Sequence, residues 1–191
     1  GLLTPQRTTK GHRLYSEKDV VTIDRILNFV TRGVAIGKVK ALLQGSDIMV
    51  SPVYQTKEWQ ESVAELMAAV ESFSTTKVSQ LIHKLFAHYP ASICRDRLME
   101  PVFTKLVLSK NSSATFGFAE SELIRYVLMR LSAKIAEKKH SDSVILMVGN
   151  QTPIWPLALM ALELSDAIFS VHLLTRELTL TAGAELARKS K

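Results

Sequence analysis

The sequence has 191 residues and a single cysteine, Cys94. One cysteine excludes an internal disulfide and a cysteine-rich zinc site, and therefore a disulfide-stapled secreted scaffold. The histidines offer no substitute, because His83 and His88 are five residues apart and do not share a helix face at metal-ligand spacing. We predict no metal site, and we expect Cys94 to pack as a small buried hydrophobic residue.

The chain also lacks an apolar run long enough to cross a membrane. Its longest stretch without charge, residues 143–162, has a polar middle rich in turn formers, whereas a spanning helix needs about 20 apolar residues. The pattern predicts instead a short strand over Val144–Val148, a loop, and a helix over 153–164 with Pro153 in its first turn and Thr152 as its cap. No apolar signal core follows an N-terminal positive charge, so we expect a cytoplasmic protein with no membrane partner.

The motifs of enzymes are absent as well. The segment from Gly33 to Val39 resembles a phosphate-binding loop, but only three residues separate its glycines and valine follows the lysine. Neither a dinucleotide-binding glycine loop nor a nucleophile elbow occurs. Glu120 and Glu122 lie two positions apart and diverge on a helix, which makes them a poor acid–base pair. We therefore predict that the protein is not an enzyme.

Acidic residues are scarce at one end of the chain. Residues 1–44 hold eight basic and three acidic side chains, a net charge of +5, whereas residues 45–191 hold 16 basic and 15 acidic side chains, a net charge of +1. This asymmetry indicates a polyanion-binding segment joined to a nearly neutral body. A merely solvated basic surface is the alternative, and charge alone does not decide between the two. We expect Lys38 and Lys40 on an exposed helix face, and a position beside the backbone of a polyanion is the alternative.

Local signals predict the order of the elements. Two short extended pieces flank a turn at Lys10-Gly11, and Ser16 with Asp19 forms a capping box that opens a helix over 17–31, ended by Gly33. Helical spacing of apolar residues then predicts a short helix before Gly45 and four longer helices, at about 56–72, 75–88, 91–108 with a kink at Pro101, and 114–138. Short connections favour an antiparallel four-helix bundle.

After Ser141 the pattern changes to strand, helix and strand, over 144–148, 153–164 and 168–174, with a last helix at 182–189. This alternation is typical of a parallel α/β unit, and about 50 residues make it a short, incomplete Rossmann-like one. The predicted fold class is therefore mostly α: an N-terminal segment, a four-helix bundle and an α/β unit.

One stretch of motifs is specific. It runs GLLTPQRT, then GHRLYS, then Asp19-Val20 and Ile23-Asp24-Arg25-Ile26, then Gly33-Val34 and KVKALL from Lys38. This stretch resembles the second half of a winged-helix DNA-binding domain of the MerR family of transcriptional regulators, in its MlrA/BluR-like subgroup. The resemblance implies a partial winged helix over 1–45, the bundle over 53–140, and a partial cobalamin-binding-like domain over 141–191. It also implies a helix-turn-helix upstream of Gly1, so that the chain is N-terminally truncated.

The resemblance places Arg7, His12, Arg13 and Tyr15 on the wing, where the family contacts DNA phosphates. The chemistry of these side chains agrees, because guanidinium groups pair with phosphate oxygens, a phenol can donate a hydrogen bond, and Gly11 permits a tight tip. Such contacts supply affinity and register but little sequence discrimination. The alternative for each residue is a solvated hairpin side chain.

Cobalamin-dependent relatives carry a bundle tryptophan followed nine residues later by Glu-His, and a cobalt-ligating histidine after the first strand of the α/β domain. Neither Trp59 nor Trp155 has such a partner, and no histidine occurs between Val148 and Trp155. Asn150 and Gln151 are poor ligands for cobalt. We therefore predict no cobalamin and no other cofactor. A pocket for another ligand, a partner-binding surface and a dimerisation role all stay open.

Two functional hypotheses follow. The first is a promoter-binding regulator that acts as a homodimer at RNA polymerase promoters, under the control of a small-molecule or protein effector. The second is a ligand- or partner-binding sensor module without autonomous DNA binding. The sequence does not encode the target promoter, the signal or the sign of regulation.

Overall fold

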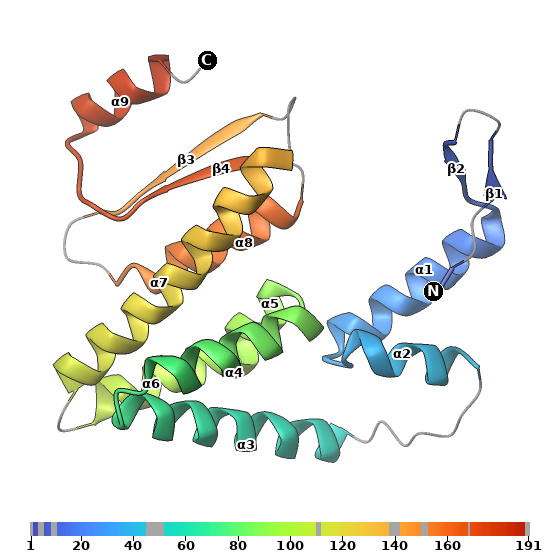
Figure 1. Ribbon diagram of the computed structural model, residues 1–191, viewed down its shortest axis with the longest axis horizontal. Coiled ribbons are helices and arrows are strands. Elements are labelled where there is room, and N and C mark those ends of the chain that lie inside the picture. Colours follow the sequence, from blue (N-terminus) through green and yellow to red (C-terminus); the bar gives the residue numbers. More distant parts are fainter. Residues whose placement is uncertain are drawn as a thin grey trace.

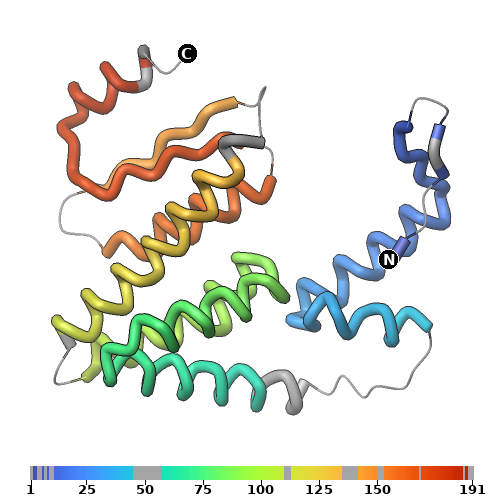
Figure 2. Tube along the Cα trace, in the orientation of Figure 1, coloured from blue at the N-terminus to red at the C-terminus, as the bar shows by residue number. Residues whose placement is uncertain are grey.

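The computed structural model describes residues 2–3, 6–8, 11–44, 52–109, 112–137, 142–149, 153–167 and 169–189. The fold is mostly helical, as predicted. An N-terminal part, residues 2–44, lies to the right of a group of central helices, residues 52–137, and an α/β part, residues 142–189, lies above these helices (Figure 1). The trace in Figure 2 follows this order from the blue hairpin to the red C-terminal helix.

The N-terminal part consists of a hairpin and two helices. Strands β1 (Gln6–Arg7) and β2 (Arg13–Leu14) pair antiparallel, and helices α1 (Glu17–Thr31) and α2 (Ile36–Leu43) follow. The predicted extended pieces and the predicted first helix are confirmed. A small core of its own holds this part together, formed by the buried residues Ile26, Val30, Val34 and Val39.

Both ends of α1 are set by local chemistry. At its start the Ser16 hydroxyl accepts the Asp19 amide at 3.3 Å, while the Asp19 carboxylate accepts the Ser16 amide at 2.8 Å, which completes the predicted capping box. At its end Gly33 takes φ +86°, a left-handed conformation that favours glycine. The Gly33 amide donates to the Val30 carbonyl and the Val34 amide to the Phe29 carbonyl, which is a Schellman motif.

The central helices pack around a larger core. They are α3 (Pro52–Glu71), α4 (Thr75–His88), α5 (Ala91–Cys94), a π-helical turn η1 (Arg95–Met99), α6 (Glu100–Leu108) and α7 (Ser112–Glu137). Apolar residues from all four predicted helical segments meet in this core, among them Val70, Ile82, Leu98, Leu106 and Leu123, each less than 2 % exposed or at that limit. α3 contacts both α4 and α6, and α7 contacts both α4 and α6 as well.

The third predicted segment is interrupted just before Pro101. Proline has no amide hydrogen to donate to the carbonyl four residues earlier. The chain widens ahead of it into η1, and the Glu100 amide bonds to the carbonyl of Arg95, five residues back. The predicted kink at Pro101 is therefore a π-helical turn over residues 95–99, and Arg95 stands at its first position.

The α/β part begins with strand β3 (Ser143–Met147) and continues through α8 (Trp155–Asp166), β4 (Ser170–Leu174) and α9 (Leu180–Lys189). The two strands are parallel and in register from Ser143↔Ser170 to Met147↔Leu174. α8 packs against α7 and β4, and α7 also contacts β4, so one face of the strand pair rests on helices (Figure 1). α9 comes close to β3 at Gly183. A Cβ at this position would lie only 2.6 Å from Met147 Cε.

The prediction for the start of α8 was wrong in its bounds. The helix begins at Trp155 rather than at residue 153, and Pro156, not Pro153, occupies its first turn. Thr152, predicted as the cap, lies outside the described residues. A carboxylate from another helix caps α8 instead.

Among the described residues, no helix has the length and hydrophobicity that a membrane span requires.

Cys94 lies at the centre of the central helices with no exposed surface. Burial raises the pKa of its thiol to about 12. At pH 8 only about one thiol in ten thousand is then ionised, and the thiolate is the nucleophile. We expect Ellman's reagent to label the folded protein far more slowly than the protein unfolded in guanidinium. Labelling at the same rate in both states would contradict this burial.

Candidate nucleic-acid interface

The hairpin at the N-terminus has a tight tip. Gly11 takes φ +84°, and its amide donates to the Thr8 carbonyl at 2.9 Å. The Thr8 amide donates to the His12 carbonyl at 2.9 Å, and the Thr8 hydroxyl accepts the His12 amide at 3.0 Å. A turn followed by a left-handed glycine is a common hairpin closure. The sequence prediction of a glycine-dependent tip is confirmed.

The strand register brings two arginine positions together. Arg7 pairs directly with Arg13 across the hairpin, and Gln6 pairs with Leu14. The Arg13 side chain is exposed, while the side chain of Arg7 lies outside the described part. The described part of the hairpin therefore offers one exposed guanidinium group, that of Arg13, and such a group pairs with anions such as phosphate.

The structure groups two of the four predicted wing residues and separates a third. Arg13 and Tyr15, two positions apart, line a cleft of about 490 Å³ beside α1. Apolar residues complete the cleft: Leu2, Leu3, Ile23, Ile26 and Leu27. His12 is exposed and is not part of this lining. Side chains alternate between the two faces of a strand, which explains why Arg13 and Tyr15 lie together without His12.

The capping box begins at Ser16, directly after Tyr15, and so fixes the point at which the chain passes from the hairpin into α1. Hydrogen bonds from the backbone and then from the hydroxyl of Ser16 lower the pKa of Asp19 from its ordinary value of 3.8. A carboxylate with a lowered native pKa stabilises the fold above its unfolded pKa. This contribution is lost as the pH falls through the native value.

We expect an Asp19→Asn variant to unfold at a lower temperature than the wild type at neutral pH. The difference should shrink as the pH falls below 3.8, because the wild-type carboxylate then becomes protonated. Thermal unfolding followed by circular dichroism at several pH values measures it. A difference in melting temperature that stays constant down to acid pH would show that Asp19 does not act through its charge.

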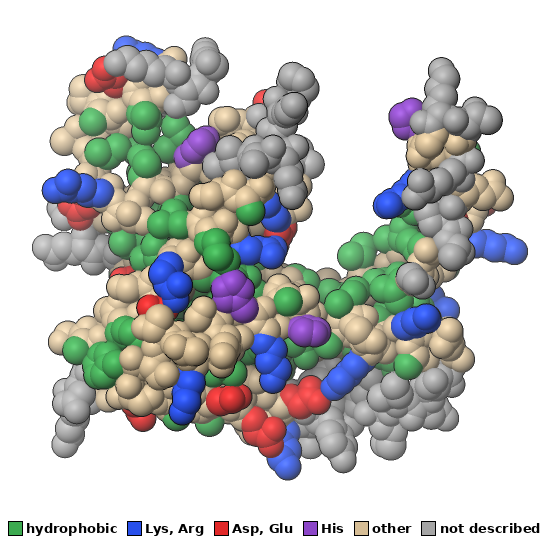
Figure 3. Space-filling view, viewed as in Figure 1, with side chains coloured by type: hydrophobic (Ala, Val, Ile, Leu, Met, Phe, Trp, Pro, Cys, Tyr) green, Lys and Arg blue, Asp and Glu red, His purple; other side chains and the backbone are tan. Residues whose placement is uncertain are grey.

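Basic side chains are spread over the N-terminal part (Figure 3). Those that the structure describes as exposed on its hairpin and helices include Arg13, Lys18, Arg25, Arg32 and Lys40. Lys40 is on an exposed helix face, as predicted. Lys38 is exposed too, but its ammonium group is already paired: Nζ donates to Glu58 Oε1 of α3 at 2.9 Å, and this bond raises the Lys38 pKa.

The Lys38–Glu58 pair belongs to a joint between the N-terminal part and the central helices. The indole Nε1 of Trp59 lies 3.8 Å from the place that a Cβ on Gly33 would take. Trp59 also packs on Tyr89 with ring centroids 4.7 Å apart. A cleft of about 370 Å³ opens beside this contact, lined by Ala35 and by residues of α3 and α4. Sequence reasoning placed Trp59 inward but had no signal for its contact with Gly33.

The histidines and glutamates rejected as metal ligands and as an acid–base pair each have a partner elsewhere in the structure. His83 stacks edge-on against Tyr126 at 4.8 Å, whereas His88 Nδ1 donates to the Lys84 carbonyl at 2.6 Å. Glu122 pairs with Arg125 and Glu120 with the start of α8. Over the part of the chain that the structure describes, no group of three or more His, Cys, Asp or Glu side chains could hold a metal ion.

Comparison with known proteins places the N-terminal part in a family context. Residues 1–46 match the family model described as MerR HTH family regulatory protein. The HTH-type transcriptional regulator MlrA of Salmonella typhimurium strain LT2 is 28% identical over 158 residues, which cover 81% of this chain and 63% of the relative. MlrA of Escherichia coli K12 is 26% identical over 159 residues, with the same coverage.

A third relative is the HTH-type transcriptional repressor CarH of Myxococcus xanthus, 25% identical over 159 residues that cover 73% of this chain and 51% of the relative. The chain thus spans less than two thirds of the length of the curated relatives it matches. The resemblance to the MerR family is confirmed: residues 1–46 carry a MerR-type segment, and most of the chain is similar to MerR-family regulators.

Proposed function

From this MerR-type segment, we propose that the chain is part of a transcriptional regulator that binds promoter DNA, with the hairpin as the wing of a winged helix. One observation carries the proposal: an exposed arginine, Arg13, lies opposite a second arginine position, Arg7, on a glycine-tipped hairpin. An exposed guanidinium such as that of Arg13 pairs with phosphate oxygens of a nucleic-acid backbone. Tyr15, beside Arg13, supplies a phenol that donates to the same backbone, and the exposed His12 is a further phosphate contact from the neighbouring position.

The proposed organisation has three domains. Residues 1–45 form the partial winged helix, 53–140 an antiparallel four-helix bundle, and 141–191 a partial Rossmann-like domain similar to cobalamin-binding ones. The contacts of α3 and α7 with both α4 and α6 support the bundle, and the parallel β3–β4 pair with its crossover helix α8 supports the Rossmann-like domain.

The proposed protein acts without catalysis, in the cytoplasm. Regulators of this class read pseudo-palindromic sites through two-fold symmetry, so we propose a homodimer. At a promoter such a dimer changes DNA shape for RNA polymerase. The bundle and the Rossmann-like domain would receive the signal, from a small molecule or a protein effector.

The alternative is a sensor module that binds a ligand or partner without binding DNA by itself. The cleft of about 370 Å³ between the N-terminal part and the central helices favours this second function. An occupant there would touch both Ala35 and the aromatic pair Trp59–Tyr89.

Fluorescence anisotropy with a labelled DNA duplex separates the two functions. A phosphate-binding wing predicts binding that weakens linearly, on logarithmic axes, as salt rises, because each neutralised phosphate releases counterions. Random-sequence and promoter duplexes should respond to salt alike. The absence of salt-sensitive binding at low ionic strength would reject the DNA-binding proposal in favour of the sensor module.

A further inference from the structure

The N-terminus of α8 is held by a side chain of another helix. Glu120 Oε1 of α7 accepts the backbone amides of Ile154 at 2.6 Å and of Trp155 at 3.0 Å. The first amides of a helix have no partner within the helix, and the helix dipole favours a negative charge beside them. The Glu120 carboxylate meets both needs and reaches them across 34 and 35 positions of sequence.

The ring of Trp155 also packs at the N-terminus of α8, against the central helices. The indole stacks on Phe103 of α6 with centroids 4.7 Å apart and planes inclined by 6°. Phe103 in turn meets Phe116 edge-on at 5.1 Å. The start of α8 is thereby joined to α6 through an aromatic stack and to α7 through a carboxylate.

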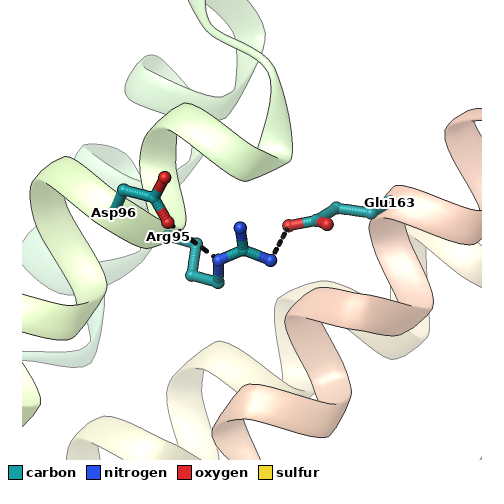
Figure 4. Close-up of polar contacts among 3 residues, drawn as sticks. All are labelled: Arg95, Asp96 and Glu163. Carbon is teal, nitrogen blue, oxygen red and sulfur yellow. Dashed lines mark hydrogen bonds and ion pairs between the residues drawn. The ribbon is translucent and has the colours of Figure 1, made fainter.

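Ion pairs extend the contact along α8. Arg95, at the first position of the π-helical turn, pairs with Glu163 at 2.6 Å and with Asp96 at 2.9 Å (Figure 4). Asp166, at the end of α8, pairs with Lys134 of α7. These pairs are partly exposed, so each contributes little to stability, and two of them join α8 to the central helices.

This junction is where a ligand of an α/β domain would bind. In open α/β sheets ligands lie beyond the carboxyl ends of the strands, against the N-terminus of the following helix. Here β3 ends at Met147 and α8 begins at Trp155, and Glu120 and Trp155 occupy that helix start. A cobalamin, which the cobalamin-dependent relatives bind, does not fit these residues, because the segment from Val148 to Trp155 offers no histidine for cobalt.

We infer that the Glu120 carboxylate acts as the N-terminal cap of α8. Through this cap the α/β part docks on the central helices, and no cobalamin is needed. The junction is assembled by the chain itself. The inference rests on the contacts of Glu120 and Trp155 and does not depend on DNA binding.

Hydrogen exchange measured by mass spectrometry tests the role of Glu120. In a Glu120→Ala variant we expect the amides at the start of α8 to exchange at least about tenfold faster, because both charge-assisted bonds are lost. A Glu65→Ala variant, which removes an exposed carboxylate in the middle of α3, is the control and should leave α8 unchanged.

A Glu120→Gln variant keeps an acceptor oxygen but loses the charge, and it should lie between the wild type and Glu120→Ala. If the alanine variant does not fold, the glutamine variant alone decides, through exchange that rises at α8 but not at α4. Unchanged exchange at α8 in the variant that folds would overturn the inference.

Titration of the wild type with hydroxocobalamin tests the second half of the inference independently. We expect the absorbance spectrum to be the sum of the separate components at every ratio. A saturable spectral shift would show that the junction opens to a corrin, and the inference would be lost. Neither the hydrogen-exchange experiment nor the cobalamin titration involves DNA. Both therefore test the inference even if the protein does not bind DNA.

Discussion

Replacing Trp59 by alanine is expected to lower the free energy of unfolding by about 3–5 kcal/mol, the usual loss when a large buried aromatic side chain is truncated. Trp59 is 7% exposed and packs against Tyr89. Its indole also lies under Gly33, where the N-terminal part meets the central helices. The change therefore leaves a cavity in the core and weakens the joint between the two parts at once.

Urea unfolding measures this loss, and Trp155 serves as the reporter because it is the other tryptophan of the chain. A Trp59→Phe variant is the matched control: it keeps an aromatic ring and should lose clearly less stability. A Lys38→Ala variant, which removes only the exposed ion pair of the joint, should cost no more than about 1 kcal/mol. Equal losses for Trp59→Ala and Lys38→Ala would contradict the buried contact.

Reversing the charge of Arg13 is expected to weaken DNA binding at low salt by about tenfold or more. Arg13→Glu removes one phosphate contact and places a carboxylate near the DNA backbone, at a cost that exceeds the loss of the contact alone. Because phosphates carry no sequence information, the loss should be the same for every duplex. Anisotropy titrations with several sequences measure it.

An Arg32→Glu variant provides the control, since it changes the net charge by the same amount. Arg32 is exposed at the C-terminal end of α1, at the opposite end of that helix from the hairpin (Figure 1). Its effect should be clearly smaller than that of Arg13→Glu. Equal effects of the two variants would mean that only net charge matters. A loss confined to one base pair would contradict a phosphate contact.

Helix boundaries followed from sequence wherever the signal was local. Ser16 and Asp19 are three positions apart and Gly33 adjoins the end of α1, so the predicted bounds of this helix agree with the structure. The spacing of apolar residues also predicted α4, whose predicted and observed bounds are both 75–88, although no side chain caps its start. A cap or a left-handed glycine acts on its own neighbours, and no knowledge of the fold is needed to recognise it.

Boundaries and contacts that depend on distant residues did not follow from sequence. The start of α8 was misplaced because its cap, Glu120, belongs to another helix. The ion pair of Lys38 with Glu58 joins two parts of the fold across 20 positions. The hairpin residues were predicted as a group of four, and only the observed strands show that Arg13 and Tyr15 share a cleft from which His12 is absent. Pairing of distant residues is a property of the packed molecule.

The salt dependence of DNA binding, compared between the wild type and Arg13→Ala, tests most directly whether the hairpin is a phosphate-binding wing. The logarithm of the association constant is plotted against the logarithm of the salt concentration. Loss of one phosphate contact is expected to reduce the steepness of this line by about 1. Arg32→Ala should leave the slope close to that of the wild type. A slope for Arg13→Ala equal to the wild-type slope would contradict the proposed wing.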